Sequence, residues 1–258
     1  SFSSLRDIEQ CPLKWQLLRS QYGDLSGFPA RPNPAAVEGE IVHEVVERLF
    51  KAMGLAGFPA PGTERFRATA AAFGVLGAVR ALVDAHEQAV AAHPRGGGFR
   101  LRSSAAELAN RAKRLFRAEY TSDSAPLPRS ETPTVGPTAP DPAALLESRG
   151  VLSAVWLRHP RIPYVGVVDL VHGTRTAPVI VEFKTGAPNV LHRQQLIAYA
   201  LLWWRRTGQL PVSAQLRYPA RSEAIAPCEG DLASLEGELE ARITSLQDVL
   251  SRSPGEAR

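Results

Sequence analysis

The segment Tyr164–Lys184 limits the possible folds more than any other part of the sequence. Its two ends, Tyr164–Val171 and Val179–Lys184, are apolar runs typical of strands, and the turn-forming stretch His172–Pro178 separates them. Strands joined by so short a connection pair antiparallel, as a hairpin. A further strand is predicted at Val151–Leu157, so the second half of the chain builds a sheet.

The same hairpin brings charged residues together. If its turn is centred between Arg175 and Thr176, Asp169 lies opposite Glu182, and Lys184 shares their face. Carboxylates among valines are costly unless they are paired or bound to a metal, and oxygen ligands suit Mg²⁺ or Mn²⁺. Lys184 would then hold an attacking water or offset charge on a phosphate. The alternative is a surface ion pair, and the spacing alone leaves both open.

Helical periodicity accounts for most of the remaining sequence. Helices are predicted at Ser3–Arg19, at Ala35–Ala52, at Glu64–His93 with a break near Gly74, from a capping box at Ser104 and Glu107 onward, at Val190–Arg206 and at Asp231–Leu250, with one more strand at Ala214–Tyr218. The expected fold is α/β, a central mixed sheet flanked by helices with a helical insertion. The expected division is 1–54 N-terminal helices, 55–120 insertion, 121–145 proline-rich linker and 146–258 core sheet with C-terminal helices.

Composition excludes some classes of protein. The two cysteines, Cys11 and Cys228, are far apart, so a disulfide framework is not expected and a cytoplasmic setting is the default. No uninterrupted apolar run is long enough to cross a bilayer and no leader is recognised, so no membrane partner is expected. The net charge of +4 suits a polyanionic partner only weakly.

Several short motifs together carry a resemblance. The series Gly166-Val167-Val168-Asp169 and then Glu182-Phe183-Lys184 resembles the G-x-x-D and E-x-K core of the PD-(D/E)XK nuclease superfamily. Three further pieces resemble its RecB-like branch, which includes CRISPR-adaptation exonucleases: Gly39–His43 as G-x-x-x-H, Gln195–Tyr199 as Q-x-x-x-Y, and Ser1–Leu5 followed by Cys11-Pro12.

The resemblance implies a restriction-endonuclease-like core and a set of roles. Mn²⁺ or Mg²⁺ would be held by His43, Asp169, Glu182 and Phe183. Catalytic roles would fall to Asp169, Glu182, Lys184, Gln195 and Tyr199, the last two also contacting the DNA strand.

Some of these roles have open alternatives. Glu44 or Glu47 is an alternative ligand on the His43 helix, and His43 is otherwise a solvated side chain on a glutamate-rich face. Gly39, one turn before His43, would let that helix approach another element closely. Relatives with an iron–sulfur cluster use four cysteines, so no cluster is expected and Cys11 is read as a small buried residue.

Basic side chains at the end of the Gln195 helix, after that helix, and on the helix that begins near Ser104 are candidates for DNA phosphate contact. They are Arg205, Arg206, Arg217 and Arg114, each with simple solubility as its alternative. The expected function is a metal-dependent DNA nuclease, exonuclease-like, in repair, recombination or CRISPR-type and anti-phage DNA processing. The alternative is a catalytically inactive DNA-binding or docking module of a helicase–nuclease complex.

Overall fold

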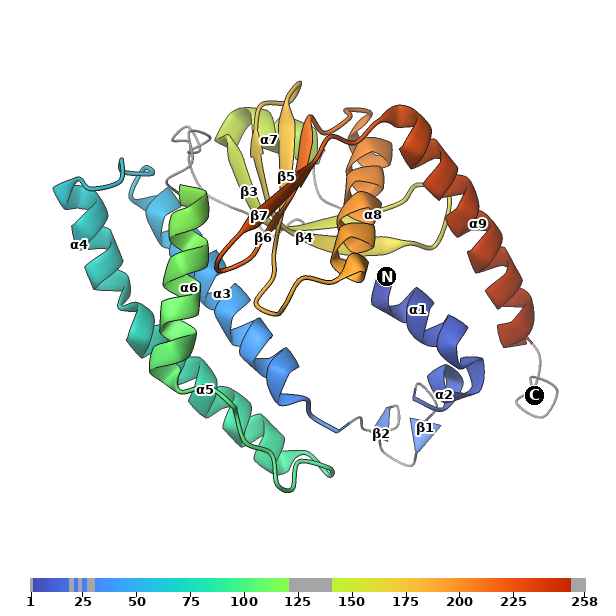
Figure 1. The fold of residues 1–258 in the computed structure, drawn as a ribbon, viewed down its shortest axis with the longest axis horizontal. Helices are drawn as coiled ribbons and strands as arrows, with labels where there is room; N and C mark the ends of the chain where they lie inside the picture. Colours follow the sequence, from blue (N-terminus) through green and yellow to red (C-terminus); the bar gives the residue numbers. More distant parts are fainter. Residues whose placement is uncertain (1, 19–20, 23–24, 27–30, 121–140, 252–258) are drawn as a thin grey trace.

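The computed structural model describes residues 2–18, 21–22, 25–26, 31–120 and 141–251. Its centre is a mixed five-stranded sheet with the order β3-β4-β5-β6-β7 (Figure 1), in which β5 and β6 pair in parallel and all other neighbours pair antiparallel. The strands are β3 (Val151–Arg158), β4 (Val165–Gly173), β5 (Pro178–Phe183), β6 (Ser213–Arg217) and β7 (Ser222–Ile225). The predicted α/β fold with a mixed sheet is therefore confirmed.

Strands β4 and β5 form the predicted hairpin. Leu170 pairs with Val181, and Val171 pairs with Ile180, which is the register expected from a turn centred between Arg175 and Thr176. The ladder ends with the Leu170–Val181 pair. Asp169 and Glu182 come next in register, just beyond the last pair of the β4–β5 ladder.

The ladder between β3 and β4 is interrupted opposite Asp169. Ser153 pairs with Leu170 and Val155 with Val168, whereas Ala154, the residue between, has a φ of 50°. A left-handed conformation costs an alanine roughly 1–2 kcal/mol. Such strain persists only where surrounding structure imposes it, and it is common beside functional sites.

Four helices lie on one side of the sheet (Figure 1): α3 (Pro34–Leu55), α4 (Glu64–Phe73), α5 (Val75–Ala92) and α6 (Ala105–Tyr120). The predicted apolar face of α3 is buried against α5, α6 and the sheet through Val42, Val45, Val46, Leu49 and Phe50. Because the helices predicted as an insertion share this core, they also hold α3 in place over the sheet.

The other face of the sheet is covered by α7 (Pro142–Arg149), α8 (Val190–Thr207) and α9 (Glu229–Ser251), with α1 (Phe2–Gln10) beside α9 (Figure 1). The fully buried Trp203 anchors α8 in this second core. The site therefore lies in a sheet with a separate core on each face.

Local sequence signals account for several helix boundaries. Gly74 adopts a left-handed φ of 62° and separates α4 from α5, close to the predicted break. The capping box before α6 is present, since Ser104 N–H donates to the Glu107 carboxylate at 2.7 Å and Glu107 N–H donates to the Ser104 hydroxyl at 3.3 Å.

Three predictions need correction. The helix expected at Ser3–Arg19 is two helices, α1 and α2 (Pro12–Leu17), because Pro12 begins a new one. Cys11 is half-buried and caps α2, its Sγ accepting from Lys14 N–H at 3.4 Å. The predicted linker 121–145 lies outside the described residues up to 140, and its end forms the first half of α7, with Asp141 as the N-cap. Strands β1 (Gln21–Tyr22) and β2 (Leu25–Ser26) were not anticipated.

One stretch of the described chain, Glu64–Ala92, is long and apolar enough to cross a membrane by length and composition alone. The stretch covers α4 and α5, and Arg80 and Asp84 interrupt its apolar residues. Its side chains Val75, Val79 and Leu82 pack in the core with α3 and α6. A single helix of this kind is weak evidence for a membrane span.

Candidate active site

Helix α3 brings His43 to the middle of β4 and the end of β5. A Cβ placed on Gly39 would lie 3.3 Å from Thr185 Oγ1, in the loop after β5, so the glycine allows the close approach expected from its position one turn before His43. The His43 Nδ1 atom lies 3.4 Å from Asp169 Oδ1. The helix and the strand thus meet at this imidazole–carboxylate pair.

The two carboxylates have different partners. Asp169 Oδ2 accepts a 2.7 Å hydrogen bond from the backbone N–H of Phe183. Glu182 Oε1 accepts a 2.7 Å bond from Lys184 Nζ, whereas Glu182 Oε2 is buried and accepts no hydrogen bond from the described residues. A buried carboxylate oxygen without a donor is costly unless a cation or water occupies the space beside it.

Lys184 is oriented by α8. Its Nζ also donates to Gln195 Oε1 at 2.9 Å, and Gln195 Nε2 donates to the Tyr199 hydroxyl at 2.6 Å. Tyr199 lies against β4, where a Cβ on Gly166 would be 2.6 Å from the tyrosine Cε1. The E-x-K, Q-x-x-x-Y and G-x-x-D residues are therefore in one chain of contacts, which reaches His43 through Asp169.

Burial and charge act differently on the two acids. Burial raises the pKa of Glu182, and the nearby Asp169 charge raises it further, to about 8. Burial also raises the pKa of Asp169, but the His43 imidazole and the Phe183 N–H outweigh it and hold that pKa below its usual value. Burial lowers the pKa of His43, and the charges of Asp169 and Glu182 reverse this, so the net shift is upward.

These shifts describe a site with excess negative charge. Two neighbouring carboxylates share one proton unless a cation lies between them. A divalent metal would supply that cation, and the donors present are carboxylate oxygens, an imidazole and the Phe183 carbonyl, since Phe183 has no side-chain donor. Among the described residues no three His, Cys, Asp or Glu side chains are already arranged around one point. The unpartnered Glu182 Oε2 nevertheless fits a metal ligand.

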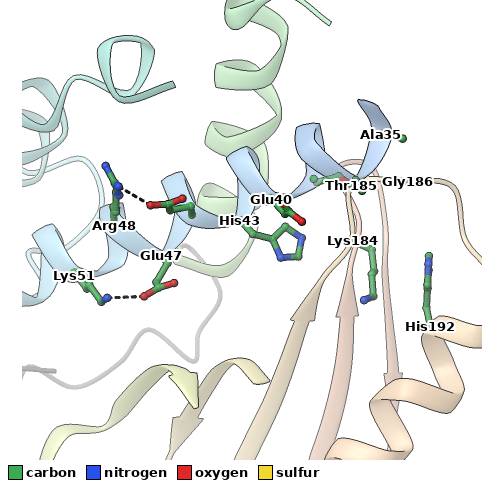
Figure 2. A pocket seen from close by; sticks show the side chains of 13 residues that line it. Ala35, Glu40, His43, Glu47, Arg48, Lys51, Lys184, Thr185, Gly186 and His192 are labelled. Carbon is green, nitrogen blue, oxygen red and sulfur yellow. Dashed lines mark hydrogen bonds and ion pairs between the residues drawn. The ribbon is translucent and has the colours of Figure 1, made fainter. Parts of the chain in front are cut away.

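Two members of the contact chain, His43 and Lys184, line a cleft of about 640 Å³. Figure 2 shows His43 from α3 and Lys184 from the end of β5 reaching into it, with His192 of α8 beside Lys184. The predicted glutamate-rich face of α3 forms one wall, where Glu44 and Glu47 pair with Arg48 and Lys51, each at 2.5 Å.

Sequence reasoning missed His192. The imidazole is half-buried, lines the cleft, and its Nδ1 lies 3.0 Å from the Tyr218 hydroxyl. It precedes Gln195 by three residues, so helical spacing alone places both on one face of α8. That spacing was the available signal.

The predicted arginines do not join the site. Arg205 Nε donates to Glu236 of α9 at 2.8 Å, and its guanidinium lies 3.7 Å from the Trp204 ring centroid. Arg217 Nε donates at 2.9 Å to the buried Glu119 of α6. The other two, Arg206 and Arg114, are exposed, and none of the four lines the cleft.

Comparison with known families agrees with this arrangement. The sequence model of the PD-(D/E)XK nuclease superfamily matches residues 1–250. The chain therefore belongs to that superfamily, and its mixed sheet flanked by helices is consistent with the restriction-endonuclease-like fold. A search of the curated proteins found no match. Membership supports a nuclease, that is, a hydrolase of phosphodiester bonds in nucleic acid.

Proposed function

We propose that this protein is a metal-dependent deoxyribonuclease of the RecB-like branch. The observation that carries the proposal is the continuous contact chain whose members His43 and Lys184 line the cleft. In it His43 meets Asp169, and Lys184 bridges Glu182 and Gln195. Residues from four elements, α3, β4, β5 and α8, converge there, together with the residue that follows β5. A chance surface ion pair would not need a second helix to orient its lysine.

The residues divide into metal ligands and groups that handle substrate. Asp169, Glu182, His43 and the Phe183 carbonyl would hold Mn²⁺ or Mg²⁺, and the imidazole favours Mn²⁺. The bound metal would polarise a phosphate oxygen and lower the pKa of a bound water.

Lys184 stands next to this site as a fixed positive charge. Its Nζ is held by Glu182 and Gln195, so it is positioned to orient a water or to stabilise charge on the phosphate. Gln195 fixes the lysine, and Tyr199 fixes Gln195. Both face the substrate strand in this proposal.

The proposal also includes the branch of the superfamily, the mode of cleavage and the biological setting. The G-x-x-x-H and Q-x-x-x-Y residues, His43 and Gln195–Tyr199, support the RecB-like branch and, with it, exonuclease-like action on DNA ends. Repair, recombination and CRISPR-type or anti-phage DNA processing are the settings we propose, with a helicase or other nuclease subunit as a partner and the cytoplasm as the location. No iron–sulfur cluster is proposed, because Cys11 caps a helix and Cys228 is exposed elsewhere.

A cleavage assay tests the proposal. End-labelled single-stranded and duplex DNA is incubated with the protein in Mn²⁺, Mg²⁺ or EDTA, beside Lys184→Ala and the control Lys113→Ala, an exposed residue of α6. We expect cleavage with metal, none in EDTA, a loss of about 100-fold or more in Lys184→Ala, and wild-type rates in the control. DNA binding without cleavage in either metal would refute the nuclease proposal and favour the inactive docking module.

A further inference from the structure

The first turn of α8 presents an imidazole to the cleft that the roles above leave unused. His192 lines the cleft with Lys184, and Figure 2 shows it beside that lysine, on the side away from His43 in this view. It is not among the groups around Asp169 and Glu182. It therefore faces the part of the cleft next to the catalytic groups.

The surroundings of His192 favour the tautomer that carries its proton on Nε2. The hydroxyl oxygen of Tyr218 accepts the backbone N–H of Asn189, and His192 Nδ1 lies 3.0 Å from the same hydroxyl, whose proton is available to donate to it. An imidazole that accepts at Nδ1 carries its proton on Nε2. Burial, together with the charge of Lys184, lowers the pKa of His192 and keeps it neutral near pH 7.

In this tautomer Nε2–H is an uncharged donor on the ring that Tyr218 contacts. No described residue accepts a hydrogen bond from it, while Tyr218, itself buried, holds the ring in place. A donor held rigidly beside a phosphate-binding lysine is suited to a phosphate oxygen, because much of its ordering cost is already met before substrate binds. A purely structural histidine, packed only to anchor α8, would not need a donor on the cleft side.

We propose that His192 binds substrate directly, donating from Nε2–H to a non-bridging oxygen of the DNA phosphate next to the one that is cleaved. This inference rests on the proposed deoxyribonuclease function and adds a substrate-binding position to it. The DNA strand would then run along the cleft from the Asp169 side, past Lys184, to His192.

Steady-state kinetics on single-stranded DNA give the first test. We expect His192→Ala to raise KM about tenfold with kcat nearly unchanged, the size of a lost hydrogen bond to a charged group. His192→Gln, which retains an N–H donor near the Nε2 position, should recover most of the affinity. Arg193→Ala, an exposed neighbour on α8, is the matched control and should behave as wild type.

A chemical substitution in the DNA separates contact from packing. Oligonucleotides that each carry one methylphosphonate, which removes the charge and one oxygen of a single phosphate, are bound in Ca²⁺ so that uncut complexes can be measured. Wild type should lose about tenfold in affinity at one position beside the cleavage site, and His192→Ala should lose nothing further at that position. Equal losses at every position in both proteins would overturn the proposal, as would wild-type affinity in His192→Ala.

The two proposals fail in different ways. Wild-type protein that binds DNA without cutting it refutes the nuclease, yet the methylphosphonate series still reveals or excludes the His192 contact. If the protein cleaves DNA but no methylphosphonate position depends on His192, the nuclease proposal is supported and the His192 contact is refuted. Absence of DNA binding in wild type overturns both.

Discussion

Replacing Gly166 by alanine tests whether the contact between β4 and α8 holds the catalytic lysine in place. A Cβ at this position would lie 2.6 Å from Tyr199 Cε1 and 3.1 Å from Leu202 Cδ1, whereas carbon atoms pack at about 3.5–4.0 Å. The tyrosine ring must therefore move by about 1 Å. Its hydroxyl would then lose the 2.6 Å bond to Gln195.

The expected cost combines three effects. Overpacking a filled core costs about 1–3 kcal/mol, and loss of the Tyr199–Gln195 hydrogen bond adds about 0.5–1.5 kcal/mol. Replacement of a strand glycine by alanine returns about 0.5–1 kcal/mol. We therefore expect Gly166→Ala to lower the free energy of unfolding by about 2 kcal/mol, and to reduce kcat through the displaced Gln195 and Lys184.

Urea denaturation followed by circular dichroism measures this in a double-mutant cycle. In a Tyr199→Ala background the new methyl group has room, so Gly166→Ala should become neutral or slightly stabilising. In a Tyr199→Phe background the ring remains, and most of the cost should persist. The argument is refuted if Gly166→Ala costs the same with and without the Tyr199 ring, or less than about 0.5 kcal/mol in the wild-type background.

Three further predictions follow from other parts of the structure. Ala154→Gly removes a left-handed alanine and should be neutral or stabilising by up to about 1 kcal/mol in the same urea assay; clear destabilisation would contradict the strain. The affinity for Mn²⁺, measured by calorimetry, should rise as the pH is raised through about 8 with protons released on binding, because Glu182 has a pKa raised to about 8 and must ionise to bind metal. Hydrogen bonds from Arg161 and Arg205 outweigh the effect of burial and lower the pKa of Glu236 in the folded protein. Ionised Glu236 therefore stabilises the fold at pH values above its pKa in the unfolded chain. This stabilisation is lost as the pH falls through its pKa in the folded protein. The stability difference between wild type and Glu236→Gln should therefore shrink between about pH 7 and about pH 3, and a difference that does not change with pH would be evidence against it.

The sequence predicted the elements whose signals are local. The two apolar runs on either side of a turn predicted both the β4–β5 hairpin and its register, which the Leu170–Val181 pair confirms. The capping box of α6 and the break at Gly74 likewise depend on a few adjacent residues. By contrast, α7 was hidden, because its proline at the N-terminus and the proline-rich stretch before it resemble a loop. The edge strand β7 is only four residues long and carries little pattern.

Two of the predicted phosphate ligands, Arg205 and Arg217, bind carboxylates that the sequence pattern did not reveal. Their partners are remote in sequence, since Glu236 is 31 residues from Arg205 and Glu119 is 98 residues from Arg217. Packing of α6 and α9 on opposite faces of the sheet supplied both carboxylates, and periodicity contains no information about such pairings.

The two cores on opposite faces of the sheet hold His43 and Lys184 independently of each other, although both residues belong to one site. His43 depends on α3, which is held by the core shared with α5 and α6, whereas Lys184 depends on Gln195 of α8, which is anchored in the opposite core. Asp169 and Glu182, on adjacent strands, join the two halves. A cavity made in the α6 core at Leu115 should therefore loosen the His43 side and weaken metal affinity, while the lysine stays bound to Gln195. A cavity at Leu201 of α8 should do the reverse, reducing kcat with metal affinity nearly retained. Equal losses of metal affinity from both cavities would mean that the sheet transmits the disturbance across its two faces.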